Sequence, residues 1–274
     1  MEIIRRGASA ADARVALFDF DGTISLIRSG WVDVMVPMMV EILADLKTGE
    51  SEEQLRAIVE EFVWKLTGKE TIYQMMEFVE HVKARGGQPL EALEYKKMYL
   101  DRLWLRIEGR IEELKSGKAS PEQYMVPGAR ALLESLHARG LKMYLASGTD
   151  EIYMKEEARL LDVSRYFAGG VYGAQDDYKS FSKKILIQRI ISTTDVQGPQ
   201  ILGFGDGYVE IEEVKQVGGV TVGVATTEPE CAVVDDWKRQ RLIGVGADYI
   251  VPNYLRHEEL LGTLFSNAFR NGHS

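Results

Sequence analysis

Two aspartates two positions apart, near the N-terminus, are the first residues whose type and spacing could carry chemistry. The segment 15–23 reads VALFDFDGT, so Asp19 and Asp21 come directly after four apolar residues. Such a run favours a buried parallel strand, and open α/β sheets bind ligands at the carboxyl ends of their strands. Two carboxylates at that edge suit a divalent cation and a phosphoryl group. The alternative is a plain Asp-Gly turn with solvated acids.

A second candidate segment, 143–149, ends in a hydroxyl residue and a glycine, Ser147 and Gly148. An apolar run precedes them and a predicted helix follows. Backbone N–H groups at a helix entrance can hold an anion, and the Ser147 hydroxyl can add a hydrogen bond. An ordinary helix cap is the alternative interpretation.

A group of lysines at the start of a predicted helix, over 182–192, forms the third segment. A cation there is unfavourable for the helix dipole, which suggests another purpose, such as neutralising a phosphate. Lys179, Lys183 and Lys184 compete for this role. We prefer Lys183, which opens the apolar helix 23 residues before Asp206. The remaining lysines are interpreted as surface residues.

The fourth segment, 201–210, is again an apolar run that ends in an acid. Asp206 follows the run and Glu210 comes four residues later, a spacing that keeps both near one corner once a helix begins. Carboxylate oxygens are ligands that Mg²⁺ prefers. An Asp-Gly turn with a solvated Glu210 is the alternative.

The elements that position these segments alternate between strand and helix. Strands are expected over 15–19, 141–146, 170–173, 200–205, 220–225 and 247–251, with a short edge strand within 1–14. Helices are expected over 128–139, 151–161, 182–192, 209–217 and 258–269. This alternation predicts an α/β fold, a Rossmann-like three-layer core with helices on both faces of a parallel sheet.

Residues 30–124 depart from the alternation, because their pattern is almost wholly helical. A block of this length is too long for a loop. We therefore expect an inserted all-helical domain over 30–124, and a core domain built from 1–29 and 125–274.

Composition limits the classes of partner. The formal net charge of the 274-residue chain is −9, which disfavours a nucleic-acid partner. Cys231 is the only cysteine, so no intrachain disulfide can form. No stretch approaches the ~20 apolar residues of a membrane span, and the N-terminus lacks an apolar signal core. These features predict a cytoplasmic protein without a membrane partner.

Together and in this order, the four segments resemble the haloacid dehalogenase-like (HAD) hydrolase superfamily. Its pattern is Asp-x-Asp-Gly-Thr, a strand-terminal Ser or Thr, a Lys, and Gly-Asp-x-x-x-Asp/Glu. The chain departs from the commoner form by carrying Glu210 in the last place. The helical block resembles the cap of the phosphoglycolate phosphatase-like branch. The match covers the core and not residues 30–124.

The resemblance implies roles for the acids. Asp19 is implied to be the nucleophile that forms an aspartyl-phosphate, and Asp21 the general acid and then base. The carboxylate of Asp19, the backbone carbonyl of Asp21, Asp206 and Glu210 are implied to hold Mg²⁺, the last directly or through water.

The resemblance also implies a phosphate site. Ser147, Gly148 and the amide of Phe20 are implied to hold the phosphoryl oxygens, with Lys183 balancing their charge. Arg28, just after the loop that leaves the site, is a further candidate contact for a substrate anion.

The leading hypothesis is a Mg²⁺-dependent phosphatase acting on a small phosphorylated metabolite, such as a sugar phosphate or phosphoglycolate. A phosphomutase of the β-phosphoglucomutase type shares the core and cap, and a catalytically silent HAD-fold binding protein is a third possibility. A dehalogenase is disfavoured, because that branch lacks an acid at the position of Asp21.

Overall fold

A mostly parallel sheet forms the centre of the protein. The computed structural model describes residues 1–175 and 183–266, and within these ranges the sheet has seven strands. The strands are β1 (Glu2–Ile3), β2 (Val15–Phe18), β3 (Lys142–Asp150), β4 (Gly170–Ala174), β5 (Ile201–Gly205), β6 (Val220–Val224) and β7 (Tyr249–Val251). Their order across the sheet is β1-β7-β6-β5-β2-β3-β4. Every neighbouring pair is parallel except β1 and β7.

The strand β2 lies between β5 and β3, and its four residues are buried. Its register with β5 pairs Phe18 with Phe204, and the backbone N–H of Asp19 donates to the Phe204 carbonyl at 2.9 Å. The residues that follow Phe18 and Phe204 therefore emerge side by side at one edge of the sheet.

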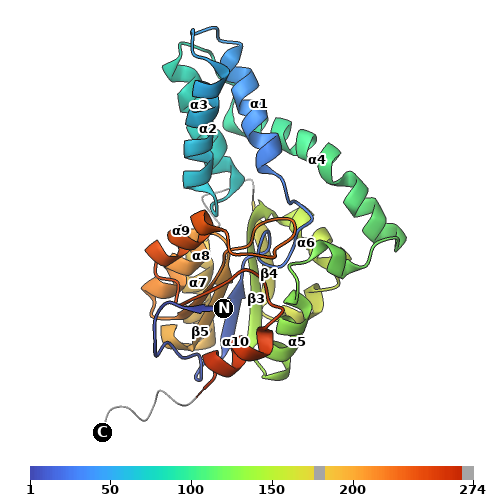
Figure 1. The fold of residues 1–274 in the computed structure, drawn as a ribbon, viewed down its shortest axis with the longest axis vertical. Coiled ribbons are helices and arrows are strands. Elements are labelled where there is room, and N and C mark those ends of the chain that lie inside the picture. The colour runs from blue at the N-terminus through green and yellow to red at the C-terminus, as the bar shows by residue number, and fades with distance from the viewer. Residues whose placement is uncertain (176–182, 267–274) are drawn as a thin grey trace.

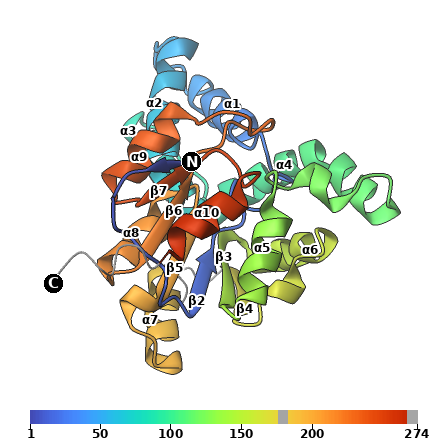
Figure 2. The same ribbon diagram turned by 60° about the horizontal axis from the view of Figure 1, so that its bottom comes forward.

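Alternate residues of β2 point to opposite faces, and each face is covered by helices. Phe18 packs in the same apolar cluster as side chains of α5 (Ala129–Ala138), α6 (Glu151–Leu160) and α10 (His257–Leu264). Leu17 packs with α7 (Lys183–Thr194) and α8 (Tyr208–Gln216), and α9 (Asp236–Gly244) packs farther along that layer. The two groups of helices can be followed in Figure 2. The predicted three-layer α/β fold is confirmed.

The predicted helical block lies between β2 and α5. It consists of α1 (Val32–Ala44), α2 (Glu52–Leu66), α3 (Thr71–Ala84) and α4 (Ala92–Ser116), and Figure 1 shows it stacked on one end of the sheet. Ser51 caps the start of α2, since its Oγ accepts the Gln54 N–H at 3.2 Å and the Gln54 side chain accepts the Ser51 N–H in return. No helix in the described parts of the chain is long and apolar enough to cross a bilayer.

The structure differs from the sequence expectations in three places. The strand β3 continues to Asp150, with an irregularity in its pairing to β4 after Ala146. The closing helix ends at Leu264 rather than 269, and residues 267–269 lie outside the described range. Helix α9 was not predicted, because Leu242 is its only buried residue and so leaves no apolar periodicity.

The start of α9 depends on a side-chain cap, which gives a first test. The carboxylate of Asp235 accepts the backbone N–H of Lys238 at 2.8 Å. We expect Asp235→Ala to lower the free energy of unfolding by about 1 kcal/mol, because a free N–H is left in the first turn. Asp235→Ser should retain most of that stability, and Asp236→Ala, at an exposed neighbour without this bond, serves as the control. Urea denaturation measures all three; equal losses for Asp235→Ala and Asp236→Ala would contradict the assignment of the cap.

Candidate active site

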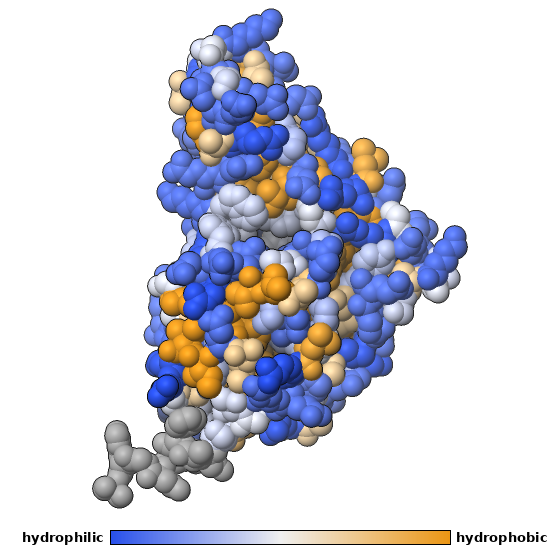
Figure 3. Space-filling view, viewed as in Figure 1, coloured by the Kyte–Doolittle hydropathy of each residue, from blue (hydrophilic) through white to orange (hydrophobic). Residues whose placement is uncertain are grey.

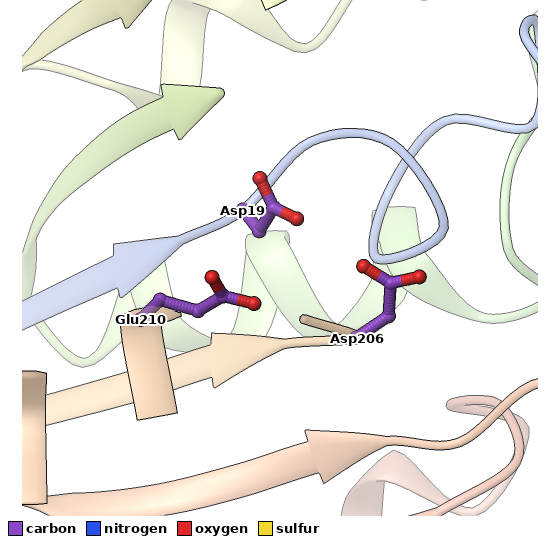
Figure 4. Close-up of side chains that lie close together, drawn as sticks. All are labelled: Asp19, Asp206 and Glu210. Carbon is purple, nitrogen blue, oxygen red and sulfur yellow. The ribbon is translucent and has the colours of Figure 1, made fainter. Parts of the chain in front are cut away.

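Three carboxylates meet where β2 and β5 end. Asp19 follows β2, Asp206 follows β5, and Glu210 stands in the first turn of α8; one oxygen from each lies within 4.8 Å of the others. Figure 4 shows the three side chains converging on one space. The parallel register of β2 and β5 brings the first two together, and the short turn into α8 adds the third.

Glycine at position 205 makes room for this arrangement. A Cβ built there would lie 1.9 Å from Oε1 of Glu210, so no other residue fits without displacing that carboxylate. The fully buried Glu210 accepts the backbone N–H of Gly207 at 2.9 Å. The cluster of hard oxygens therefore fits a divalent cation such as Mg²⁺, and the missing Cβ of Gly205 leaves space for the Glu210 carboxylate.

Asp21 is held apart from this cluster by two hydroxyl groups. Its Oδ2 accepts hydrogen bonds from Ser147 at 3.1 Å and from Thr149 at 2.8 Å. Its buried Oδ1 has no hydrogen-bond partner within the described structure. One carboxylate oxygen is thus fixed and the other is left for a ligand, an arrangement suited to proton transfer.

The turn after Asp21 brings the first loop against Asp206. Gly22 has a φ of +70°, and a Cβ there would lie 2.3 Å from Oδ2 of Asp206. Glycine is therefore required at position 22 both by the backbone conformation and by the close approach to Asp206.

Of the predicted phosphate-binding residues, two line the cavity and a third, Phe20, has its ring buried away from solvent. Ser147 is buried and, with Gly148, lines the same cavity as the aspartates. Phe20 lies between the two aspartates with a fully buried ring, and its carbonyl accepts the Ile24 N–H at 2.8 Å. The phosphate-binding role of its amide stays a prediction.

The structure does not decide which of the three candidate lysines faces the site. Lys183 begins α7, but its side chain lies outside what the structure describes, as does Lys179 entirely. Lys184 is exposed and lies 3.8 Å from Glu213, away from the cavity. The preference for Lys183 therefore remains a prediction.

The aspartates face a cavity between the sheet and the helical block. Figure 3 shows the surface hollowed where these two parts meet. The cavity volume is about 100 Å³. Residues of the helical block that line it are Trp31, Met35, Thr67, Gly68, Lys69, Thr71, Gln74, Lys96, Tyr99 and Leu100. A ligand bound at the carboxylates would therefore contact both parts of the chain.

Two buried ion pairs border this cavity. Arg28 makes two close hydrogen bonds to Glu157, at 2.6 and 3.0 Å, and Lys96 pairs with Asp150. Burial lowers the pKa of Arg28, but the charges of Glu157 and Asp21 raise it more strongly and keep it above its ordinary value. Arg28 is thus fully charged and already partnered.

A model of the haloacid dehalogenase-like hydrolases matches residues 13–218, three quarters of the chain. The chain belongs to this family. The match spans all four motif segments and the helical block between the first two. The resemblance drawn from the motifs is therefore confirmed.

Solved structures show the same fold at low identity. A predicted phosphoglycolate phosphatase from Haemophilus somnus 129pt is 14% identical, with a TM-score of 0.58 over 91% of this chain and 98% of its own. A conserved HAD-like protein of unknown function from Agrobacterium tumefaciens C58 is 16% identical, with a TM-score of 0.60 over 93% and 100%. A putative β-phosphoglucomutase from Thermotoga maritima is 18% identical, with a TM-score of 0.52 over 95% and 100%. A comparison with curated proteins finds no significant match.

Sequence reasoning missed a buried lysine beside the HAD acidic cluster. Lys238 of α9 donates to Asp206 and to Glu228, each at 3.0 Å. Burial lowers the pKa of Lys238, but Asp206 and Glu228 raise it above its ordinary value, so it is a fixed positive charge. Thr149 was missed too, although it lies two residues after Ser147. Asp235, a residue type that commonly caps helices, could have indicated the start of α9. Nothing in the sequence indicates that the Lys238 side chain contacts Asp206.

The space beside Gly205 can be tested by filling it. We expect Gly205→Ala to lower the free energy of unfolding by about 1–3 kcal/mol, because the new Cβ collides with the Glu210 carboxylate. Displacing that carboxylate should also weaken the thermal stabilisation given by Mg²⁺. Gly262→Ala is the matched control, since a Cβ there meets nothing within 4 Å. Thermal unfolding with and without Mg²⁺ measures both effects; if the two variants behave alike, the role given to Gly205 is wrong.

Proposed function

We propose that this HAD hydrolase is a Mg²⁺-dependent phosphatase of a small phosphorylated metabolite. The observation that carries the proposal is the acidic cluster of Asp19, Asp206 and Glu210 beside an Asp21 with one fixed and one unpartnered oxygen. One carboxylate is thereby available as a nucleophile next to a second that can transfer a proton.

The reaction would proceed in two in-line displacements. The Asp19 carboxylate attacks phosphorus, the bond to the leaving oxygen breaks, and Asp21 donates its proton to that oxygen. Asp21 then takes a proton from water, whose oxygen attacks the aspartyl-phosphate and releases inorganic phosphate and free Asp19. The hydroxyl group of Thr149 keeps Asp21 oriented in both steps, so the single hydrogen of the Ser147 hydroxyl can turn to a phosphoryl oxygen when substrate binds.

Asp19, Asp206 and Glu210 would hold the metal, with the backbone carbonyl of Asp21 as a further ligand. Mg²⁺ bound there would offset the charge of the phosphoryl oxygens and of the carboxylates around them. The fixed charge of Lys238 keeps Asp206 in place from the opposite side.

Ser147, Gly148, the amide of Phe20 and Lys183 would bind the phosphoryl oxygens. Ser147 and Gly148 line the cavity next to Asp19, which supports this assignment.

Residues 30–124 would act as a cap domain on a core of 1–29 and 125–274. The cavity lined from both parts supports this division, because a substrate between them would be shielded from bulk water. The single, buried Cys231 supports a reducing compartment such as the cytoplasm.

The paired cations favour a leaving alcohol that carries further hydroxyl groups over one that carries a carboxylate. Arg28 and Lys96 line the cavity, but Glu157 and Asp150 already neutralise them. A substrate carboxylate would meet Asp150, which lines the cavity, as well as the cations, whereas hydroxyl groups can bond to either Lys96 or Asp150. A sugar phosphate is therefore the proposed substrate class, in preference to phosphoglycolate.

Replacing the two aspartates tests the chemistry. We expect Asp19→Asn to abolish turnover, about 10⁴-fold or more, because the nucleophile is lost. Asp21→Asn should cost about 10²- to 10⁴-fold, because proton transfer is lost. Asp45→Asn, at an exposed position that does not line the cavity, should leave activity unchanged. Phosphate release with Mg²⁺ and with EDTA measures this; release that persists in EDTA or in Asp19→Asn would refute the proposal.

The substrate class is tested with a panel of phosphate esters. We expect kcat/KM for the preferred sugar phosphate to exceed that for phosphoglycolate by about tenfold or more. The reason is that the Asp150 carboxylate at the cavity repels the carboxylate of phosphoglycolate. Replacing Asp150 with Asn should reduce this preference, since it leaves Lys96 free for an anion. Phosphoglycolate as the best substrate of the unmodified enzyme would contradict the assignment, and an isomerised sugar phosphate without free phosphate would favour a phosphomutase.

A further inference from the structure

Arg241 on α9 joins the sheet-bearing part of the chain to the helical block. Its guanidinium donates to the backbone carbonyls of Trp64, Lys65 and Thr67, the last two at 2.6 and 3.1 Å. These carbonyls stand at the C-terminal end of α2, where the last turn of a helix lacks its i+4 donors and carries partial negative charge. The Trp64 carbonyl also accepts the backbone N–H of Thr67 at 3.2 Å. One cation thus satisfies three acceptors of the other part of the chain.

Aromatic rings surround this contact. The guanidinium lies 4.5 Å from the ring centroid of Tyr208 and 5.1 Å from that of Trp237. The Trp237 ring in turn packs against Trp64 at 5.0 Å. The end of α2 is therefore held to α9 by an aromatic contact as well as by hydrogen bonds.

The segment that directly follows α2, residues 67–70, rests on the end of β3 and on the turn after β5, both of which carry candidate site residues. A Cβ at Gly207 would lie 2.8 Å from the Cα of Gly68, and a Cβ at Gly148 would lie 2.8 Å from the carbonyl oxygen of Lys69. Gly207 follows Asp206, and Gly148 follows Ser147. The chain crosses the site here at backbone contact distance, and Thr67, Gly68 and Lys69 line the cavity.

We propose that Arg241 is a positioning residue that seats the 67–70 segment over the acidic cluster and so completes the substrate cavity. Arg241 does not itself line that cavity, so it acts through the backbone that it holds. The effect on catalysis rests on the proposed phosphatase function. The effect on the position of the segment does not depend on it.

The chain provides a matched control two residues away. Arg239, on the same helix, pairs with Glu2 at 2.8 Å and makes no contact with α2 among the described interactions. It is partly buried and also ties two distant segments together. A general effect of removing an arginine from α9 should therefore appear in Arg239→Met as well.

Tryptophan fluorescence reports the seating directly. Of the four tryptophans, Trp64 and Trp237 touch at the Arg241 contact, and Trp31 packs against Trp64 with 6.2 Å between ring centroids. We expect Arg241→Met to shift the emission to longer wavelength, because the end of α2 leaves α9 and these rings gain water. Arg239→Met should match the unmodified protein, and Arg241→Lys should be intermediate, because a lysine cannot span three carbonyls.

Kinetics give the second readout. We expect Arg241→Met to raise KM about tenfold with a smaller change in kcat. The variant loses the charge-assisted hydrogen bonds that position part of the binding cavity, whereas the carboxylates of Asp19, Asp206 and Glu210 keep their positions. Unchanged emission and KM relative to Arg239→Met would overturn the proposal. If Arg241→Met does not fold, Arg241→Lys decides the question by the same two readouts. If the unmodified protein releases no phosphate but Arg241→Met still shifts the emission, the positioning role of Arg241 is supported and the proposed phosphatase function is refuted.

Discussion

The parallel pairing of β2 with β5 is the constraint on which the rest of the site depends. It places Asp19 and Asp206 side by side in a buried position, and the start of α8 adds Glu210. Like charges brought together out of water repel, so such a cluster is tolerated only when cations or donors compensate it. The protein supplies Lys238 on Asp206 and a backbone N–H on Glu210, and the three carboxylates together could hold a divalent ion.

The same balance of charge extends into the cavity above the cluster. Arg28 and Lys96 would each be costly to bury alone, and each is paired with an acid of the sheet-bearing part, Glu157 and Asp150. Because Lys96 belongs to α4 and Asp150 to the end of β3, this pair also ties the helical block to the strand that carries Ser147. Lys96 is therefore a structural link between the two parts of the chain as well as a potential ligand contact.

The sequence predicted those parts of the site that are local to strand ends. Asp19, Asp21, Ser147, Gly148 and Asp206 could be found because each follows an apolar run, and the carboxyl ends of parallel strands share one edge. Lys238 and Arg241 could not be found in this way. Their helix buries a single residue and shows no apolar stripe, and Arg241 binds a carbonyl 177 positions away. Contacts between a side chain and distant backbone carbonyls leave no trace in residue spacing, since any residue can supply the carbonyl.

The position of these two cations on α9 connects the acidic cluster to the helical block. Lys238 and Arg241 are three residues apart, so they lie on one face of the helix. The first binds Asp206 and the second binds the end of α2, from which the 67–70 segment crosses directly onto Gly207. A displacement of α9 would therefore move the carboxylate and the segment above it together. Because α9 owes its place to one buried leucine, a side-chain cap and these polar contacts, the seating of the helical block and the geometry of the acidic cluster stabilise each other.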